Sequence, residues 1–321
     1  MDKDILEKIN NPKLSYPRVA YGKTLAELGE QNDKIVAVDA DLAKSTKTAY
    51  FQEKFPHRFF DMGISEADMV TTAAGISSCG FTVFASTFSI FLTGRAWEQI
   101  RNTVAYGNFN VKLVATHAGI TVGPDGASHQ ALEDIALISA IPNMKIMAGG
   151  DYLSTVNLVK LIAEQKGPFY LRLPRCKAVE LYSDTDKFYL GGSQQLSSGN
   201  DITIISYGLM LQRSLSAAQE LNKQGIKARV IDMYSIKPFD YDAVLSAAGE
   251  TKGIVVAEEH TIKGGLGSQI ATFLSQHQPT KIKYVSMKDE FGRSGEPQEL
   301  LDHYQLTSNS IVEKSLEIIN D

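Results

Sequence analysis

Cysteine is scarce in this chain, which has only Cys79 and Cys176 among its 321 residues. The two are too far apart for the short spacing of a zinc site, and too few for the disulfide framework of a small secreted domain. We therefore predict that both are buried structural thiols in a reducing environment. The charged first residues, MDKDI, are unlike a secretory signal. We expect a cytoplasmic protein.

Long hydrophobic runs, short repeats and an excess of positive charge are absent as well. No apolar stretch approaches the roughly 20 residues that cross a bilayer. A net charge of −5 with dispersed lysines argues against nucleic acid or an anionic membrane as a partner. What is present is the composition of a globular protein, with 43% hydrophobic and 21% charged residues. The length is sufficient for two domains.

Strand-like and helix-like segments alternate along the chain. In the first half the predicted strands are 35–38, 58–60, 81–85, 111–116, 145–148 and 169–173. The predicted helices there are 18–31, 65–78, 87–106 and a helix from an N-cap at Asp151 to 165. After a polar stretch over 174–199 the alternation resumes with strands 202–206, 228–232, 253–257 and 282–286, and with helices 209–224, 241–248, 267–276 and one from 307. This pattern predicts an α/β fold of two consecutive domains, residues 1–185 and 186–321, each a mainly parallel sheet flanked by helices.

The segment 117–129, HAGITVGPDGASH, is the most informative motif. Two imidazoles and a carboxylate lie there on a glycine-rich loop, between a predicted strand and a helix that we expect to begin near Gln130. Ligands of open α/β sheets bind at this end of the strands, and glycine lets a backbone come close to them. One alternative is a plain surface turn. Another is a metal site from His117, Asp125 and His129, which no short His-x₃-His spacing or cysteine pair supports.

Three other polar loops follow predicted strands: DADLAKS at 39–45, DMGISE at 61–66 and ASTFSIF at 85–91. The carboxyl ends of parallel strands share one edge of a sheet, so we expect all four loops to converge there. Glu66 starts a helix of small apolar residues. It is either a carboxylate favoured by the helix dipole or a carboxyl that holds a shared proton. Phe88 and Phe91 face the same way on a helix, as a core pair or as a ring-binding pair.

These motifs resemble a known family. The first half closely resembles the pyrimidine-binding domain of transketolases, and the second half resembles their C-terminal domain. The resemblance extends over nearly the whole chain, and its motifs are Arg18, DLAKS at 41–45, GISE at 63–66, TFSIF at 87–91 and the segment 117–130. The sequence looks like the separately encoded C-terminal half of a split transketolase. This implies transfer of a two-carbon ketol unit from a ketose phosphate to an aldose phosphate, as in the pentose phosphate pathway.

The resemblance implies a thiamine diphosphate site. In these enzymes a glutamate at the position of Glu66 hydrogen-bonds N1′ of the aminopyrimidine. The protein then supplies orientation and proton transfer to chemistry that belongs to the cofactor. Phe88 and Phe91 match positions whose rings pack against the pyrimidine. Asp41 and Leu42 match further cofactor-binding positions.

The resemblance also implies substrate contacts. His117 matches a histidine at the substrate hydroxyls and the reaction centre, so with Glu66 it is an implied catalytic residue. Asp125 matches a carboxylate that reads the hydroxyl beside the acceptor aldehyde. Arginine contacts phosphate oxygens bidentately, so several cations around one anion make a strong site. The groups that match the sugar-phosphate site are His129, Arg18, Ser45 and, with a less regular spacing, Arg172.

Two departures from the family stand out. A further family aromatic falls on Gly94, which leaves the third wall of the pyrimidine pocket to Arg95 or Trp97. Complete thiamine diphosphate enzymes also hold Mg²⁺ and the diphosphate with a Gly-Asp-Gly…Asn motif, which this sequence lacks. Gly150-Asp151 does not complete the motif, and we interpret it as a helix cap. We therefore expect no metal ligands here, Mg²⁺ ligands on a separate N-terminal transketolase subunit, and an α₂β₂ heterotetramer.

Three alternatives to a transketolase subunit stay open. Half of a 1-deoxyxylulose-5-phosphate synthase is the nearest, but that family favours Glu-Gln-His where this chain has EAD at 66–68, and usually has arginine where Phe91 stands. β subunits of 2-oxoacid dehydrogenases lack the pattern at 117–129. A noncatalytic regulatory subunit of the same fold is the third. The loop KGGLGS at 263–268 lacks the ending of a P-loop. We expect it to be structural, with the neighbouring EEH at 258–260 at the surface or an interface.

Overall fold

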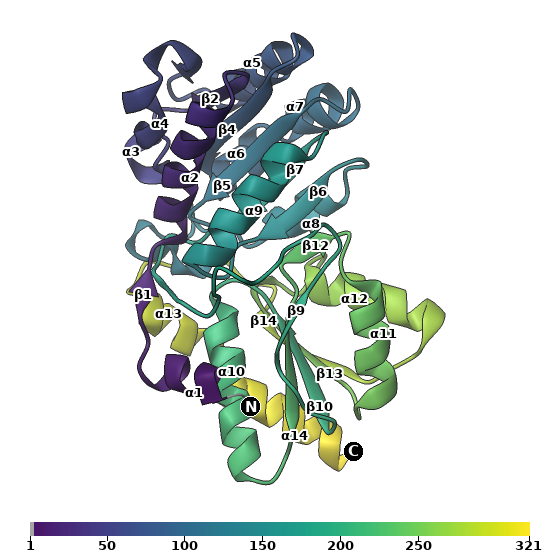
Figure 1. Cartoon of the computed structure of the whole chain (residues 1–321). Coiled ribbons are helices and arrows are strands. Elements are labelled where there is room, and N and C mark those ends of the chain that lie inside the picture. Colours follow the sequence, from purple (N-terminus) through teal and green to yellow (C-terminus); the bar gives the residue numbers. More distant parts are fainter. Residues whose placement is uncertain (1–2) are drawn as a thin grey trace.

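The computed structural model describes residues 3–321. Two larger sheets lie in the upper and the lower part of the molecule as drawn in Figure 1. In the described residues the upper sheet has seven strands, in the order β12 (Ser235–Lys237), β6 (Lys145–Ala148), β7 (Phe169–Arg172), β5 (Val111–Thr116), β4 (Thr82–Phe88), β2 (Ile35–Asp39) and β3 (Phe59–Asp61). All pairs are parallel except β12 with β6. The α-helices of this half are α2 (Pro17–Gln31), α3 (Ala43–Thr46), α4 (Ala49–Lys54), α5 (Glu66–Ser78), α6 (Ser89–Arg95), α7 (Trp97–Gln99), α8 (Asp134–Ser139) and α9 (Tyr152–Glu164).

The lower sheet has five strands in the described residues, in the order β14 (Ile282–Met287), β13 (Ile254–Thr261), β10 (Ile202–Ser206), β11 (Ala228–Asp232) and β9 (Gln194–Ser197). Only β9 is antiparallel to its neighbour. The accompanying helices are α1 (Lys3–Asn10), α10 (Met210–Lys223), α11 (Tyr241–Glu250), α12 (Leu266–His277), α13 (Pro297–His303) and α14 (Ser308–Asn320). A short antiparallel pair joins β1 (Leu14–Ser15) to β8 (Ala178–Val179).

The predicted α/β fold of two consecutive domains with mainly parallel sheets is confirmed. Strands β2, β5 and β10 are buried at every residue, as parallel strands covered by helices must be. The division between residues 185 and 186 stays a prediction. Two elements pack with the half of the molecule on the other side of this division. β12 joins the upper sheet, and α1 lies beside α10 in the lower half (Figure 1). Among the described residues, no helix has the length and apolar character needed to span a membrane.

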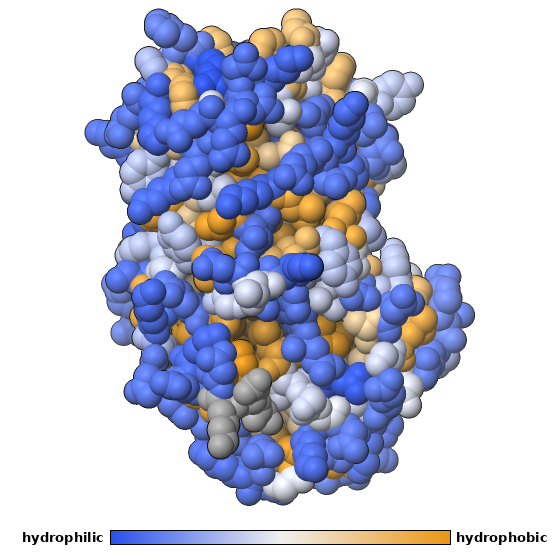
Figure 2. Space-filling view, viewed as in Figure 1, coloured by the Kyte–Doolittle hydropathy of each residue, from blue (hydrophilic) through white to orange (hydrophobic). Residues whose placement is uncertain are grey.

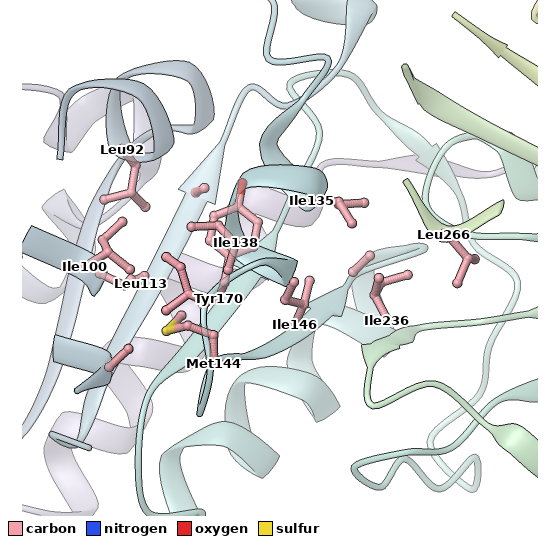
Figure 3. Close-up of a cluster of buried hydrophobic side chains, with 14 of the residues drawn as sticks. Leu92, Ile100, Leu113, Ile135, Ile138, Met144, Ile146, Tyr170, Ile236 and Leu266 are labelled. Carbon is pink, nitrogen blue, oxygen red and sulfur yellow. The ribbon is translucent and has the colours of Figure 1, made fainter. Parts of the chain in front are cut away.

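The two halves share a hydrophobic core. Ile135, Ile138 and Ile146 of the upper half belong to the same buried cluster as Ile236 of β12 and Leu266 of the lower half (Figure 3). The face shown in Figure 2 is mostly hydrophilic, and its hydrophobic residues come to the surface mainly across the middle. The shared core holds the lower half against the edge of the upper sheet formed by β6 and β12.

Two predicted helix boundaries are wrong. The helix expected over 87–106 is replaced by the end of β4, by α6 and α7, and by a π-helical turn at Ile100–Ala105. The strand is longer than predicted because Phe88 still pairs with Thr116 of β5. The helix expected near Gln130 begins only at Asp134, and the loop before it contains a 3₁₀ segment, Ile120–Asp125.

Two predicted exposures are also wrong. Cys79 is exposed and Cys176 is half-buried, so neither is a buried thiol. Glu258, Glu259 and His260 were expected at the surface or an interface, and the surface alternative is wrong, because β13 continues through them to Thr261 and buries them. Glu259 does lie where the two halves meet, since it accepts the Thr121 N–H.

The glycine-rich loop at 263–268 has the structural role expected of it. The Glu258 carboxylate accepts hydrogen bonds from the backbone N–H groups of Leu266 at 2.9 Å and Gly267 at 3.0 Å. These are unpaired donors at the start of α12, which a buried carboxylate satisfies. A Cβ atom added at Gly265 would lie 2.6 Å from the Glu258 oxygens, so the close approach requires glycine.

Candidate active site

The four polar loops leave neighbouring strands at one edge of the upper sheet, as expected. β3, β2, β4 and β5 are adjacent and parallel, with Asp39 opposite Asp61 and Ser86, and Phe88 opposite Thr116. Parallel strands send the chain out in the same direction, so the segments that follow these residues lie side by side. This edge collects most of the predicted site residues.

A buried carboxylate organises the loop that carries Asp41, Leu42 and Ser45. Asp39 accepts hydrogen bonds from the Leu42 N–H at 2.7 Å and from the hydroxyls of Thr46 and Thr48, each at 2.8 Å. Burial raises the pKa of Asp39 to about 6, although these hydrogen bonds oppose the shift. The bonds fix the backbone of the loop, in which Asp41 has a positive φ of 61° and is exposed.

Glu66 is the first residue of α5 and is only 4% exposed. Its Oε1 accepts a hydrogen bond from Arg95 Nη1 at 2.9 Å. The Arg95 guanidinium also lies over the Phe91 ring, 4.3 Å from its centroid. Beside Arg95, a Cβ atom added at Gly94 would meet nothing within 4 Å. Trp97 instead donates from its Nε1 to the Leu137 carbonyl.

Four of the predicted residues form one continuous aromatic stack. The Phe88 and His117 rings are 3.8 Å apart between centroids and nearly parallel, at 21°. Phe88 and Phe91 are stacked at 5.8 Å, and the His129 ring meets Phe91 edge-on at 5.2 Å. The end of β4, the start of α6 and the 117–129 loop thus meet at a single point. Both interpretations of the two phenylalanines, a core pair or a ring-binding pair, stay predictions.

The His117 imidazole is held neutral. It is 3% exposed, its φ is 59°, and its Nδ1 lies 2.9 Å from Thr116 Oγ1. Burial, followed by the positive charges of Arg18 and Arg175, lowers the pKa of His117 to about 3. A neutral imidazole has one donor and one acceptor nitrogen, so it is suited to hydroxyl groups.

Positive charge gathers next to His117. Arg18 Nη1 donates to the Ser45 carbonyl at 2.9 Å, and Arg175 Nη1 donates to the Val122 carbonyl. Burial lowers the pKa of Arg18, and the nearby charge of Arg175 lowers it further. Arg18 and Arg175 therefore give this side of His117 a positive electrostatic potential.

Arg175 is a cation near Arg18 and His117 that the sequence analysis did not name, whereas Arg172, which it did name, is engaged inside the fold. Arg172 lies inside β7, 5% exposed, with its Nε 2.8 Å from Asp134 Oδ2 and its Nη2 2.9 Å from the Glu259 carbonyl. These contacts occupy its Nε and Nη2 atoms within the fold, and a phosphate contact of Arg172 stays a prediction. The signal that could have found Arg175 was available, since it follows the predicted strand 169–173 whereas Arg172 lies within it.

Asp125 and His129 both lie on the 117–129 loop. Asp125 ends the 3₁₀ segment and is exposed, and His129 is half-buried with its Nδ1 3.0 Å from Ser128 Oγ. Within residues 3–321, no three side chains of His, Cys, Asp or Glu are grouped as metal ligands. The arrangement brings a buried carboxyl group, aromatic rings and positively charged side chains to one edge of the sheet.

Comparison with known proteins accounts for both halves. The model of the transketolase pyrimidine-binding domain matches residues 16–179, and that of the transketolase C-terminal domain matches residues 191–311. The chain is 45% identical over 303 residues to a transketolase C-terminal section from Methanocaldococcus jannaschii, covering 94% of this chain and 95% of that protein. It is 36% identical over 301 residues to the 6-deoxy-6-sulfo-D-fructose transketolase subunit SqwH from a Clostridium species, covering 94% of each.

A solved structure agrees with these matches. It is described as a split gene transketolase, inactive beta4 tetramer, and it superposes with a TM-score of 0.89 at 45% identity, covering 95% of this chain and 98% of that one. The expected resemblance to the C-terminal half of a split transketolase is confirmed. Enzymes of this kind use thiamine diphosphate. The chain therefore belongs to the transketolase family, of which it carries the pyrimidine-binding and C-terminal domains.

Proposed function

We propose that this chain is the C-terminal subunit of a thiamine diphosphate-dependent transketolase. The reaction is transfer of a two-carbon ketol unit from a ketose phosphate to an aldose phosphate, in the cytoplasm. The observation that carries the proposal is the stack of Phe88, Phe91, His117 and His129, linked through Arg95 to the buried Glu66. Membership of the transketolase family supports it.

The donor set fits an aminopyrimidine. Such a ring needs a carboxyl group at its nitrogen and flat apolar contacts on its faces, which Glu66, Phe88 and Phe91 offer together. Arg95 takes Oε1 of Glu66, which leaves Oε2 for the ring. When bound, thiamine diphosphate supplies the carbon nucleophile that no side chain provides. Glu66 holds the proton at N1′, and Asp41 and Leu42 border the cofactor from the adjacent loop.

The cationic side of the site fits a sugar phosphate. Arg18, Arg175 and His129 hold the phosphate, with Ser45 beside them, which positions the sugar for reaction at its other end. The neutral His117 contacts substrate hydroxyls near the reaction centre. Asp125, exposed on the loop, contacts the hydroxyl next to the acceptor aldehyde.

A partner subunit completes the proposed site. We expect an N-terminal transketolase subunit to bind Mg²⁺ and the diphosphate, so that each active site forms between two kinds of chain in an α₂β₂ assembly. Two relatives are named a section and a subunit, which supports a division of the enzyme between chains. The structure described as an inactive beta4 tetramer favours inactivity of such a chain without its partner.

The test is reconstitution. The chain is mixed with a purified N-terminal transketolase subunit, thiamine diphosphate and Mg²⁺, and ketol transfer from xylulose 5-phosphate, fructose 6-phosphate or 6-deoxy-6-sulfo-D-fructose to ribose 5-phosphate is measured. We expect turnover by the complex and none by the chain alone. Glu66→Gln should lower kcat at least about 100-fold without lowering the melting temperature, because the amide cannot share a proton with N1′. Asp68→Asn, an exposed change in the same turn of α5, is the matched control.

Each alternative has its own signature in this assay. Ketol transfer by the isolated chain would contradict the shared site, and near-normal turnover of Glu66→Gln would refute the role of Glu66. Carbon dioxide released from pyruvate with glyceraldehyde 3-phosphate as acceptor would indicate a 1-deoxyxylulose-5-phosphate synthase. A complex that forms but converts none of these substrates would indicate a regulatory subunit.

A further inference from the structure

The loop that carries His117 and His129 rests on the lower half of the molecule, which contains none of the candidate site residues. The Thr121 N–H donates to Glu259 Oε1 at 2.6 Å. After the loop, the N–H of Thr261, also on β13, donates to the Leu132 carbonyl at 2.7 Å. One strand of the lower sheet thus holds the loop at two points.

Glu259 and its neighbour Glu258 serve different elements. Successive side chains of a strand point to opposite faces. Glu258 accordingly binds the start of α12 and the Tyr207 hydroxyl, whereas Glu259 binds the loop. Both are buried, at 0% and 3% exposure. Substituting Glu258 and Glu259 one at a time therefore distinguishes contacts within the lower half from the contact with the loop.

The environment of Glu259 explains why a carboxylate is tolerated there. A buried charge is costly unless it is hydrogen-bonded and paired. Burial raises the pKa of Glu259, and the charge of Arg172 opposes the shift, while Arg172 Nη2 also donates to the Glu259 carbonyl. Arg172 of the upper half therefore holds the Glu259 backbone, and its charge favours the ionised form of the Glu259 side chain.

Gly119 shows that the loop is shaped around this carboxylate. Its φ is +86°, a conformation that favours glycine. A Cβ atom added at Gly119 would lie 2.4 Å from Glu259 Cδ. Since Gly119 and Thr121 closely follow His117, the contact fixes the backbone that leaves the imidazole stacked on Phe88.

A second clamp acts on the far side of the loop. The Gln130 amide, next to His129, donates to the Ile120 carbonyl at 3.1 Å and to the Arg293 carbonyl at 2.9 Å. Arg293 belongs to the lower half. The loop between Thr121 and Gln130 is thus anchored at both ends, with Glu259 as its charged anchor.

We propose that Glu259 is a positioning residue, which sets the conformation of the 117–129 loop so that His117 and His129 face Phe88 and Phe91. The inference rests on the proposed function for its catalytic meaning. It gives the C-terminal domain a specific part in the active site, that of holding the substrate loop from behind.

The test compares Glu259→Ala with Glu258→Ala by hydrogen–deuterium exchange of the full chain. We expect Glu259→Ala to raise exchange at 118–126 about tenfold, as loss of a charge-assisted hydrogen bond does, with α12 unchanged. Glu258→Ala should raise exchange at 264–269 and leave the loop unchanged. Equal loop exchange in wild type and Glu259→Ala would overturn the proposal. If the alanine variant does not fold, Glu259→Asp, which keeps the charge and shortens the reach, replaces it.

Kinetics of the reconstituted complex supply a readout that a loss of stability would not move. Glu259→Ala should lower kcat and raise the KM for ribose 5-phosphate about tenfold, and Glu259→Gln, which keeps an acceptor oxygen, should recover most of both. Unchanged kcat and KM per folded site would overturn the positioning role. The two failures can be told apart because the exchange measurement needs no catalysis. A wild-type complex without ketol transfer would refute the proposed function, whereas the effect of Glu259 on the loop would still be decided by hydrogen–deuterium exchange.

Discussion

Arg172 and Arg175 lie three residues apart and have opposite surroundings. Arg172 is buried in an ion pair with Asp134, whose carboxylate also accepts hydrogen bonds from the hydroxyls of Ser89 and Tyr170. Arg175 is half-buried beside Arg18 and His117. We therefore expect the first arginine to stabilise the fold and the second to contact the phosphate of the proposed function.

The pair gives a prediction in which binding and stability separate. Arg175→Met should raise the KM for ribose 5-phosphate about tenfold or more in the reconstituted complex, with little effect on unphosphorylated ribose, because a cation is lost from the phosphate site. Arg172→Met should instead lower the free energy of unfolding by about 3–5 kcal/mol, since it leaves Asp134 buried without its partner. Steady-state kinetics and urea unfolding measure the two effects. Equal changes for both sugars in Arg175→Met would exclude a phosphate contact.

Residues in contiguous motifs could be predicted, and residues defined by tertiary contacts could not. Glu66, Phe88 and His117 follow strands of one parallel sheet, so the sequence indicated their convergence. Arg95 and Glu259 act through partners distant in sequence, Glu66 and Thr121 respectively. No local pattern marks these contacts, so the sequence analysis named Arg95 only as one of two residues beside Gly94 and placed Glu259 at the surface or an interface.

Among the elements, α1 shows how far the chain order can differ from the spatial order. It begins the chain but packs on the lower half, where Ile5 and Ile9 join the buried cluster that includes Leu211 and Leu215 of α10. Lys8 Nζ also donates to the Leu181 carbonyl at 2.9 Å, on the segment that connects the halves. The helix thus ties the start of the chain to the second sheet.

This packing predicts that α1 contributes to stability and not to catalysis. Ile9→Ala should lower the free energy of unfolding by about 2 kcal/mol, the lower end of the range for removing a buried isoleucine side chain, because Ile9 retains some exposure. kcat and KM of the complex should not change. Guanidinium unfolding and the transketolase assay are the measurements, with the exposed Glu7→Ala as the control. A destabilisation no larger than that of the control would mean that α1 does not pack on α10 in solution.

Elements were predictable where one physical signal dominated. The central strands are continuous apolar runs, and Asp151 forms the expected cap, accepting the Ser154 N–H at 2.7 Å. The predicted start of the helix over 87–106 was wrong because pairing with β5 keeps the chain in the strand conformation as far as Phe88. No strand was predicted at β12. Its three residues carry no local sign that they pair with β6, which lies about 90 residues earlier in the chain.

At the scale of the whole molecule, a buried carboxyl group lies where the two halves join. Asp232 ends β11 in the lower sheet, and its Oδ2 accepts a hydrogen bond from the Tyr182 hydroxyl on the connecting segment. Asp151, at the start of α9 in the upper half, accepts the N–H groups of Leu181 and Tyr182 at 2.8 and 3.0 Å. Asp232 Oδ1 is buried without a hydrogen-bond partner among the described residues. An unpaired buried oxygen is costly for a charged carboxylate and far less so for a neutral acid.

Asp232 should therefore lower the free energy of unfolding of the chain as the pH rises. Burial raises the pKa of Asp232 to about 8, from 3.8 in an unfolded chain, and the nearby Asp151 adds to the shift. Between these two values the folded state binds the proton more tightly, so the free energy of unfolding falls from about pH 4 to about pH 8, by at most about 1.4 kcal/mol per pH unit. Asp232→Asn should flatten this decline and raise stability at pH 8, whereas the exposed Asp242→Asn should not. Urea unfolding at pH 5, 6, 7 and 8 measures the slopes, and parallel curves for Asp232→Asn and wild type would mean that Asp232 is already ionised in the folded protein.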